Sequence, residues 1–318
     1  MSFARTVLGD INANEMGLTY SHEHIVIEEG FSTLSNPGFI LNDINRISEE
    51  LKELYQYGGR TVVDTMPAAS GRNVLKLAEV SRKSKIHIIA PTGIHLEKYY
   101  PPNHWRYHLS VDELTELFVK DIETGIDEYD YNSPVIKRTA HKAGLIKLAT
   151  GDETFTPHQR TIFEAVVNAQ LQTGAPILTH TNNGLQAMEQ VELFQQLGAD
   201  LKHIVLSHVD RRKDLIFHRD LMQTGVYVEY DSHFRWKETE ENWTYQLLEK
   251  LLPDFSNQIV AGMDMARNSY WRSYGGKPGL IYLLTTFKEE LKKRGLDNYF
   301  EKLFFLNPQK LFTFTITQ

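Results

Sequence analysis

Eight short apolar runs rich in β-branched residues recur along the chain, and each ends near a polar residue. They cover residues 18–27, 60–67, 86–93, 143–150, 175–181, 203–210, 226–232 and 258–264. The segments between them show helical periodicity, as in the stripe of Ile47, Leu51 and Leu54. Eight strands that alternate with helices over about 250 residues predict a (β/α)8 TIM barrel of the α/β class.

An open, doubly wound sheet is the alternative to a barrel. If it bound a dinucleotide, such a sheet would carry a glycine-rich phosphate turn after its first strand, and SHEHIVIEEG is no such turn. The first eighteen residues predict a short N-terminal β-hairpin that closes the bottom of the barrel. No linker or low-complexity segment interrupts the chain, so residues 1–318 are expected to form a single domain.

Composition excludes several classes of partner and chemistry. The chain has a formal charge of −7 and a pI near 6.0, which argues against nucleic acid or an anionic membrane as a partner. It has no cysteine, so disulfides and thiolate chemistry are excluded, and any metal must be held by nitrogen and oxygen. Neither a signal-peptide core nor a membrane-length apolar segment occurs, which predicts a cytoplasmic protein.

Polar side chains stand at the ends of five of the predicted strands. His22 and His24 have the i, i+2 spacing of one strand face, and Glu23 between them faces the other way. In a barrel the C-terminal strand ends converge on one rim, where active sites lie. A set of histidines with an aspartate at that rim predicts a metal site. The full set is His22, His24, Lys147, His180, His208 and Asp264.

Each of these residues also has a structural interpretation. A single histidine at a strand end is more often a surface or hydrogen-bonded residue than a ligand. Asp264 could be a helix N-cap. Lys147 has apolar neighbours on both sides, and a buried unpaired ammonium is costly, so it is either paired with a barrel acid or is a neutral or modified amine.

The stretch RTVLGDINANEMGLTYSHEHI resembles the N-terminal signature of the phosphotriesterase-like family of the amidohydrolase superfamily. The resemblance continues through Lys147, THT at His180, SHVD at His208 and AGMD at Asp264. It implies a binuclear centre in which His22, His24 and Asp264 bind the more buried metal and His180 and His208 the more exposed one. It also implies that Lys147 is carboxylated and bridges the two ions, which are zinc, with manganese or cobalt as alternatives, and that Asp264 accepts the proton of the bridging hydroxide.

The loops after the seventh and eighth strands bear on the substrate. The resemblance there is to the branch that hydrolyses phosphorylated sugar lactones, in which Lys237, Arg267 and Tyr270 match the phosphate-binding positions. A solvated loop surface is the structural alternative. Two departures argue against a homoserine lactonase or an efficient phosphotriesterase: the segment TGIH places His95 where family lactonases carry tyrosine, and His233 follows Asp-Ser instead of an Asp-Arg-aromatic pattern.

The expected function is therefore a metal-dependent hydrolase that opens a phosphorylated sugar lactone. Another lactonase, carboxylesterase or phosphotriesterase activity at the same centre is the alternative, and a non-catalytic metal-binding protein is a third interpretation. His95 and His233 are candidate pocket residues. The aromatic segment 95–110 is either a lid or a packed loop, and the family resemblance implies a possible homodimer.

Overall fold

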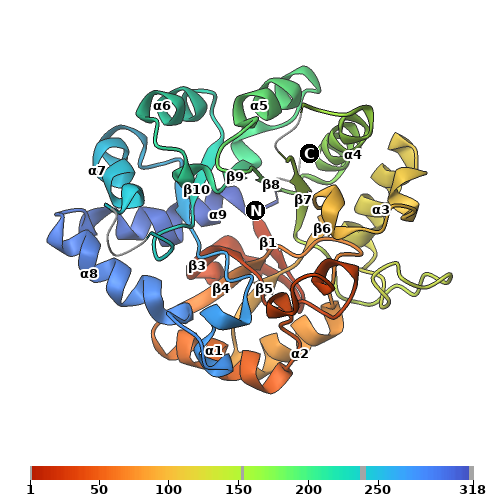
Figure 1. Cartoon of the computed structure of the whole chain (residues 1–318), viewed down its shortest axis with the longest axis horizontal. Helices are drawn as coiled ribbons and strands as arrows, with labels where there is room; N and C mark the ends of the chain where they lie inside the picture. The colour runs from red at the N-terminus through yellow and green to blue at the C-terminus, as the bar shows by residue number, and fades with distance from the viewer. Residues whose placement is uncertain (1, 152–153, 237–240, 315–318) are drawn as a thin grey trace.

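The computed structural model describes residues 2–151, 154–236 and 241–314, and it shows a barrel of parallel strands ringed by helices (Figure 1). Strands β3 to β5 pair in one parallel ladder and β6 to β11 in another, both in chain order. The predicted (β/α)8 barrel is confirmed. The strands are β3 (Leu18–Glu23), β4 (Gly59–Asp64), β5 (His87–Ile89), β6 (Pro91–Gly93), β7 (Leu145–Ala149), β8 (Ile177–His180), β9 (Ile204–Ser207), β10 (Tyr227–Tyr230) and β11 (Ile259–Ala261).

Nine strand segments fill the eight barrel positions, because Ala90 divides the predicted third strand into β5 and β6. The barrel closes between β11 and β3, where the backbone N–H groups of Met263 and Asp264 donate to the His22 carbonyl at 3.2 and 2.9 Å. Gly262 permits this approach, since a Cβ atom there would lie 2.7 Å from the His22 nitrogen. The closure therefore brings the first and last of the predicted metal ligands together.

Helices alternate with the strands, as the barrel prediction requires. In α1, Ile47, Leu51 and Leu54 are buried, and the Asp43 side chain caps the first turn. The helices are α1 (Ile44–Gln56), α2 (Val74–Ser84), α3 (Val111–Glu123), α4 (Pro157–Thr173), α5 (Ala187–Gln196), α6 (Leu215–Gln223), α7 (Trp243–Phe255), α8 (Thr286–Lys293) and α9 (Asn307–Leu311). Within the described residues, no helix is both long and apolar enough to cross a membrane.

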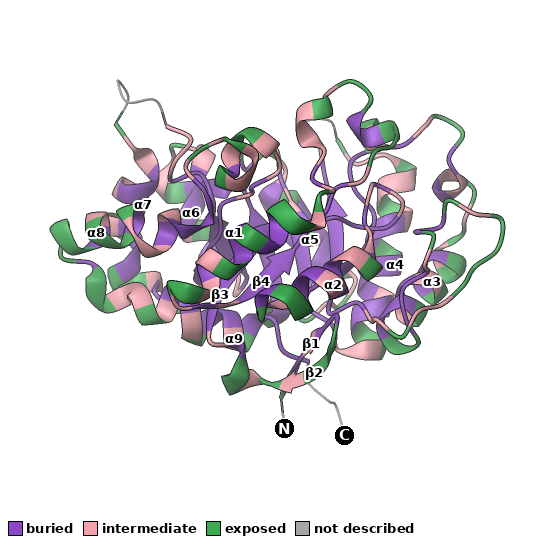
Figure 2. Cartoon of the chain, turned by 90° about the horizontal axis from the view of Figure 1, so that it is seen from below, coloured by how far each residue is buried: buried purple, intermediate pink, exposed green. Residues whose placement is uncertain are grey.

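The predicted N-terminal hairpin is confirmed, with β1 (Phe3–Thr6) antiparallel to β2 (Gly9–Asn12). Figure 2 shows it at the end of the barrel where both termini lie. The Phe3 ring stacks on Phe314 with 5.0 Å between ring centroids. Apolar side chains from seven strands, among them Val63, Leu145 and Val260, fill the barrel interior and pack against Ala4 of the hairpin. The end of the barrel that carries the hairpin is therefore closed by packed side chains, and a functional site is expected at the opposite end.

Candidate metal centre

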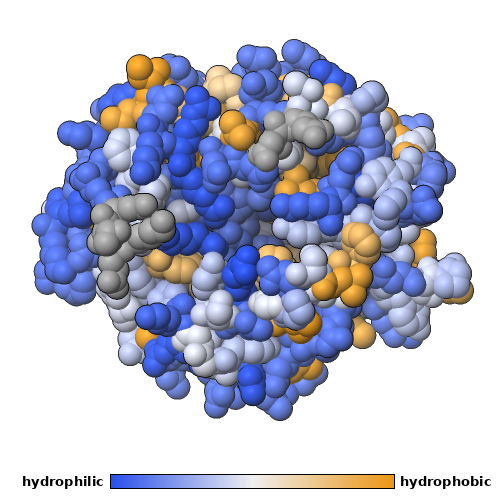
Figure 3. All heavy atoms as spheres, viewed as in Figure 1, coloured by the Kyte–Doolittle hydropathy of each residue, from blue (hydrophilic) through white to orange (hydrophobic). Residues whose placement is uncertain are grey.

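A cavity of about 250 Å³ lies at the C-terminal ends of the barrel strands, where Figure 3 shows a hollow in the middle of the face with mostly hydrophilic surroundings. All six predicted metal ligands line it. They come from β3 and the residue after it, β7, β8, and the residues that follow β9 and β11. The fold thus brings together side chains that are up to 242 positions apart, from His22 to Asp264.

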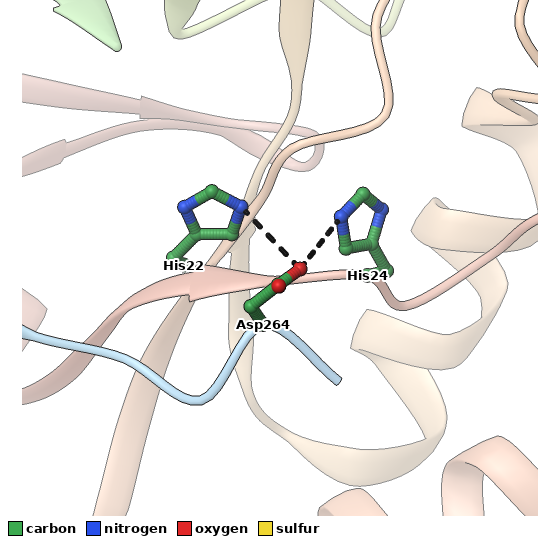
Figure 4. A group of neighbouring side chains, drawn as sticks. All are labelled: His22, His24 and Asp264. Carbon is green, nitrogen blue, oxygen red and sulfur yellow. Dashed lines mark ion pairs between the residues drawn. The ribbon is translucent and has the colours of Figure 1, made fainter. Parts of the chain in front are cut away.

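His22, His24 and Asp264 face one another across a short gap (Figure 4). The Nε2 atoms of His22 and His24 lie 3.8 and 3.3 Å from Asp264 Oδ1. Two ligands at about 2.0–2.1 Å from a tetrahedral zinc ion lie roughly 3.3 Å apart, so this spacing suits atoms that share an ion. Burial also lowers the pKa of His22 well below its usual value, which keeps the imidazole neutral, as ligation requires.

A second group of potential ligands consists of His22, His208 and Asp231. Asp231 Oδ2 lies 2.6 Å from His208 Nδ1, and Glu229 Oε2 lies 2.7 Å from His22 Nδ1. Both acids belong to β10 or the residue after it, and their i, i+2 spacing directs them into the barrel. Each carboxylate accepts from Nδ1 and leaves Nε2 of its histidine for a cation, which is the usual support of a metal ligand.

His180 is the least buried of the histidines predicted as ligands. Its Nε2 atom lies 2.8 Å from Asn182 Oδ1, so the proton sits on Nε2 and the lone pair of Nδ1 is free. Its ring lies 4.6 Å from that of His208, between centroids. His180 is thus the more exposed of the two histidines that the family resemblance assigns to the second ion.

Lys147 is buried, and no carboxylate among the described residues lies within ion-pair distance of its amine. The expectation of a pair with a barrel acid is therefore not supported. Burial lowers the pKa of Lys147 to about 8, so the neutral amine, although still the minor form at pH 7, is far more populated than in an exposed lysine. Gly93 of β6 packs directly on the Lys147 backbone, where a Cβ atom would lie within 1.9 Å of the carbonyl oxygen.

Asp264 does not cap a helix. It follows β11 with φ of +51°, a left-handed conformation that is uncommon outside glycine, and His208 shares it with φ of +65°. The Nη2 atoms of Arg211 and Arg235 lie 3.2 and 3.0 Å from Asp264 Oδ2. Although burial opposes ionisation, the Arg235 guanidinium and the neighbouring histidines hold the pKa of Asp264 well below its usual value.

Glu23 points away from the cavity, as its position between His22 and His24 predicts. Its carboxylate accepts hydrogen bonds from the N–H groups of Met263 and Met265 at 2.9 and 3.3 Å. Glu23 therefore anchors the loop that carries Asp264.

Some of the predicted substrate-binding residues line the cavity and others do not. Arg267, Tyr270 and His95 line the cavity, whereas Lys237 lies outside the described residues. His233 is not brought to the cavity. It is buried behind β10, with Nε2 2.8 Å from the Tyr230 carbonyl oxygen. The chain turns back after β10, and sequence periodicity does not specify that turn.

The two parts of segment 95–110 have different surroundings. Lys98 and Tyr99, in the short helix η4 (Glu97–Tyr99), line the cavity. His104 and Arg106, further along, are buried, and Arg106 lies over the Tyr107 ring at 3.9 Å. One part of the segment therefore borders the cavity, while the remainder is packed.

Sequence reasoning missed several residues of the site. The sequence places Arg235 among the loop cations that could hold a phosphate, but it does not predict the contacts of Arg211 and Arg235 with Asp264. It also assigns no role to Glu229 and Asp231. The two acids did carry a signal, since VYVEYDS places alternate carboxylates in a strand that is otherwise apolar. The contacts of the two arginines with Asp264 have no comparable signal, because they depend on how three strand ends meet.

A parallel barrel with nitrogen and oxygen ligands at its strand ends is the arrangement of a metal-dependent hydrolase. The profile of the Phosphotriesterase family matches residues 2–312, so the chain belongs to this family and is a hydrolase that acts on ester bonds.

Three known proteins are similar over nearly the whole chain. A phospho-furanose lactonase of Mycoplasmopsis agalactiae is 31% identical, and the alignment covers 98% of this chain and 92% of the relative. The crystal structure of a lactonase from Listeria monocytogenes superposes with a TM-score of 0.90 at 30% identity, covering 98% of this chain and 99% of the other. The phosphotriesterase homology protein of Escherichia coli, solved with phosphate in its active site, has a TM-score of 0.85 at 29% identity and covers 94% and 99%.

Proposed function

We propose that this protein is a binuclear-metal lactonase that opens the ring of a phosphorylated sugar lactone. The observation that carries the proposal is the charge of the cavity that holds the ligand set. Four cationic side chains line it besides Lys147, and among the described residues Asp264 is the one lining carboxylate. A dianionic phosphate fits such a cavity. The four are Lys98, Arg211, Arg235 and Arg267.

Arg267 is the cation best placed for a phosphate. Arg211 and Arg235 are already paired with Asp264, whereas no ion pair in the described part of the chain involves Arg267. Its guanidinium lies 4.7 Å above the Phe39 ring, which leaves its edge free for two parallel hydrogen bonds to phosphate oxygens. Tyr270 lies three positions further along and lines the same cavity. The family resemblance adds Lys237 to the residues proposed to bind the phosphate.

The ligand residues fit a pair of divalent cations, zinc in the first instance. His22, His24 and Asp264 would hold one ion, His180 and His208 the other, and a carboxylated Lys147 would bridge them. Carboxylation requires the neutral amine that burial favours, and it converts a buried cation into an anionic ligand. Two bound cations would supply hydroxide near neutral pH and polarise the lactone carbonyl.

Side chains of the protein then transfer the proton of the attacking oxygen and hold the carboxylate that carries it. Asp264 would accept the proton of the attacking oxygen and pass it to the ring oxygen as the carbon–oxygen bond breaks. Arg211 and Arg235 hold its carboxylate in place at 3.2 and 3.0 Å. The products are a carboxylate and an alcohol on one chain, with the phosphate still bound at the rim.

The test is a substrate panel with the purified, metal-loaded protein. Five- and six-membered sugar lactones are assayed in phosphorylated and free forms, beside an aryl ester and an aryl phosphotriester. We expect the highest kcat/KM on a phosphorylated lactone and loss of that activity after treatment with a chelator, with about two metal ions bound per chain. Faster hydrolysis of aryl esters or of free lactones would contradict the proposal.

A further inference from the structure

His95 differs from the ligand histidines in the group that faces its Nδ1 atom. A carboxylate oxygen of Glu229 faces Nδ1 of His22, so that nitrogen carries a proton and donates it. The group facing Nδ1 of His95 is itself a donor, the Leu96 N–H at 2.8 Å. A ring nitrogen that accepts a hydrogen bond has no proton, so a neutral His95 carries its proton on Nε2.

This tautomer excludes His95 from the metal ligands even though it lines the same cavity. Ligation through Nε2 would move the proton to Nδ1, where two N–H groups would then oppose each other at 2.8 Å. Ligation through Nδ1 would displace the Leu96 hydrogen bond. What His95 can offer to the cavity is therefore an Nε2–H donor.

The ring is held firmly in this orientation. The His95 backbone N–H donates to the Tyr100 hydroxyl at 2.9 Å, and that hydroxyl donates to the Ala68 carbonyl at 3.0 Å. The Tyr99 ring packs on one side, with 4.5 Å between centroids, and the His180 ring lies 5.6 Å away. A donor fixed beforehand costs no reorganisation during the reaction. It also stands next to His180, the side of the centre where the carbonyl would be polarised.

We propose that His95 is a catalytic residue whose Nε2–H donates a hydrogen bond to the carbonyl oxygen of the lactone. This role rests on the proposed lactonase function. When the nucleophilic oxygen bonds to the carbonyl carbon, the π electron pair moves onto the carbonyl oxygen, and the His95 donor stabilises that charge without giving up its proton. The pair returns as the ring carbon–oxygen bond breaks, and the leaving oxygen takes the proton held by Asp264.

The test compares three substitutions of similar shape. In His95→Gln the side-chain amide nitrogen can reach the position of Nε2, whereas in His95→Asn it reaches only that of Nδ1, and His95→Phe has no donor. Loss of one such donor typically costs about 10²- to 10³-fold in kcat. We expect losses of that size for Phe and Asn, recovery to within about tenfold for Gln, and wild-type metal content in all three. Similar kcat in Phe and Gln, or an effect on KM alone, would overturn the proposal.

A second measurement does not depend on turnover. Long-range ¹H–¹⁵N correlation spectra of the zinc-loaded protein report which imidazole nitrogen is protonated, and the His95 signal is assigned by its absence in His95→Gln. We expect a neutral Nε2–H ring, and an Nδ1–H or zinc-bound ring would refute the role.

The proposed substrate and the role of His95 can fail separately. If the wild type opens only free lactones, the phosphorylated substrate class is wrong. The kcat comparison is then made on the free lactone and still tests His95.

Discussion

The inner end and the rim of the cavity are built in different ways. At the inner end, His22 and His208 are 1% and 2% exposed and lie in a strand or directly after one. In each of them a buried carboxylate contacts Nδ1. At the rim, Arg267 and Tyr270 lie on a loop and the short helix η8 (Asn268–Tyr270), and both are half-buried. Phe39 is the aromatic support of Arg267, at 4.7 Å.

The difference shows how the barrel divides its tasks. Strand ends are fixed by the sheet, so the side chains predicted there as ligands are already oriented, and neighbouring strands supply the acceptors that orient them. Loops leave the sheet and can change length and composition with little effect on the core. We therefore expect substitutions at the inner end to remove the chemistry, and substitutions at the rim to change the preference among substrates.

The largest effect is expected for Lys147→Met. Methionine fills much the same buried space but has no amine to carboxylate, so the bridge between the ions cannot form. We expect metal content to fall well below two ions per chain, with a loss of kcat on the order of 10³-fold or more, as for groups that act as a unit. Metal analysis and steady-state kinetics provide the measurement.

Lys98→Met is the matched control, because Lys98 also lines the cavity but is exposed on η4. It should keep both ions. Full metal loading of Lys147→Met would refute the carboxylated bridge, and loss of metal in both variants would show that the effect is not specific to the inner end.

At the rim, Arg267→Ala should separate phosphorylated from free lactones. A hydrogen bond to a charged group contributes about 1.5–3 kcal/mol, so we expect a loss of roughly 10- to 100-fold in kcat/KM on the phosphorylated lactone. The free lactone should lose much less, and metal content should stay unchanged. Arg272→Ala, an exposed arginine of the same loop paired with Glu53, is the control and should leave both rates unchanged. An equal loss on both lactones would exclude a phosphate role for Arg267.

The same division explains what could be predicted from the sequence. Period-two alternation and strand order are enough to place His22, His180 and Asp264 at one rim, because the C-terminal ends of all strands of a parallel barrel lie on the same side. Loop directions have no comparable rule, so His233 is predicted in the cavity and is found behind β10. Arg211 reaches Asp264 only through the packing of separate strand ends, which no local pattern encodes.

The smallest effect is expected when pH is changed. It should alter activation by metal at the inner end of the cavity but not the substrate preference set at the rim. CO₂ reacts with a neutral amine, and burial brings the pKa of Lys147 to about 8 in the metal-free protein. The amine is mostly protonated at pH 7 and mostly neutral at pH 8.5, so its reactive fraction rises about eightfold over that interval. At constant dissolved CO₂, the rate at which metal-free protein becomes active with added metal should rise by a similar factor.

Arginine stays charged throughout, so the preference for phosphorylated over free lactone should not follow this rise. A loading rate that is independent of pH would contradict carboxylation of Lys147 as the limiting step.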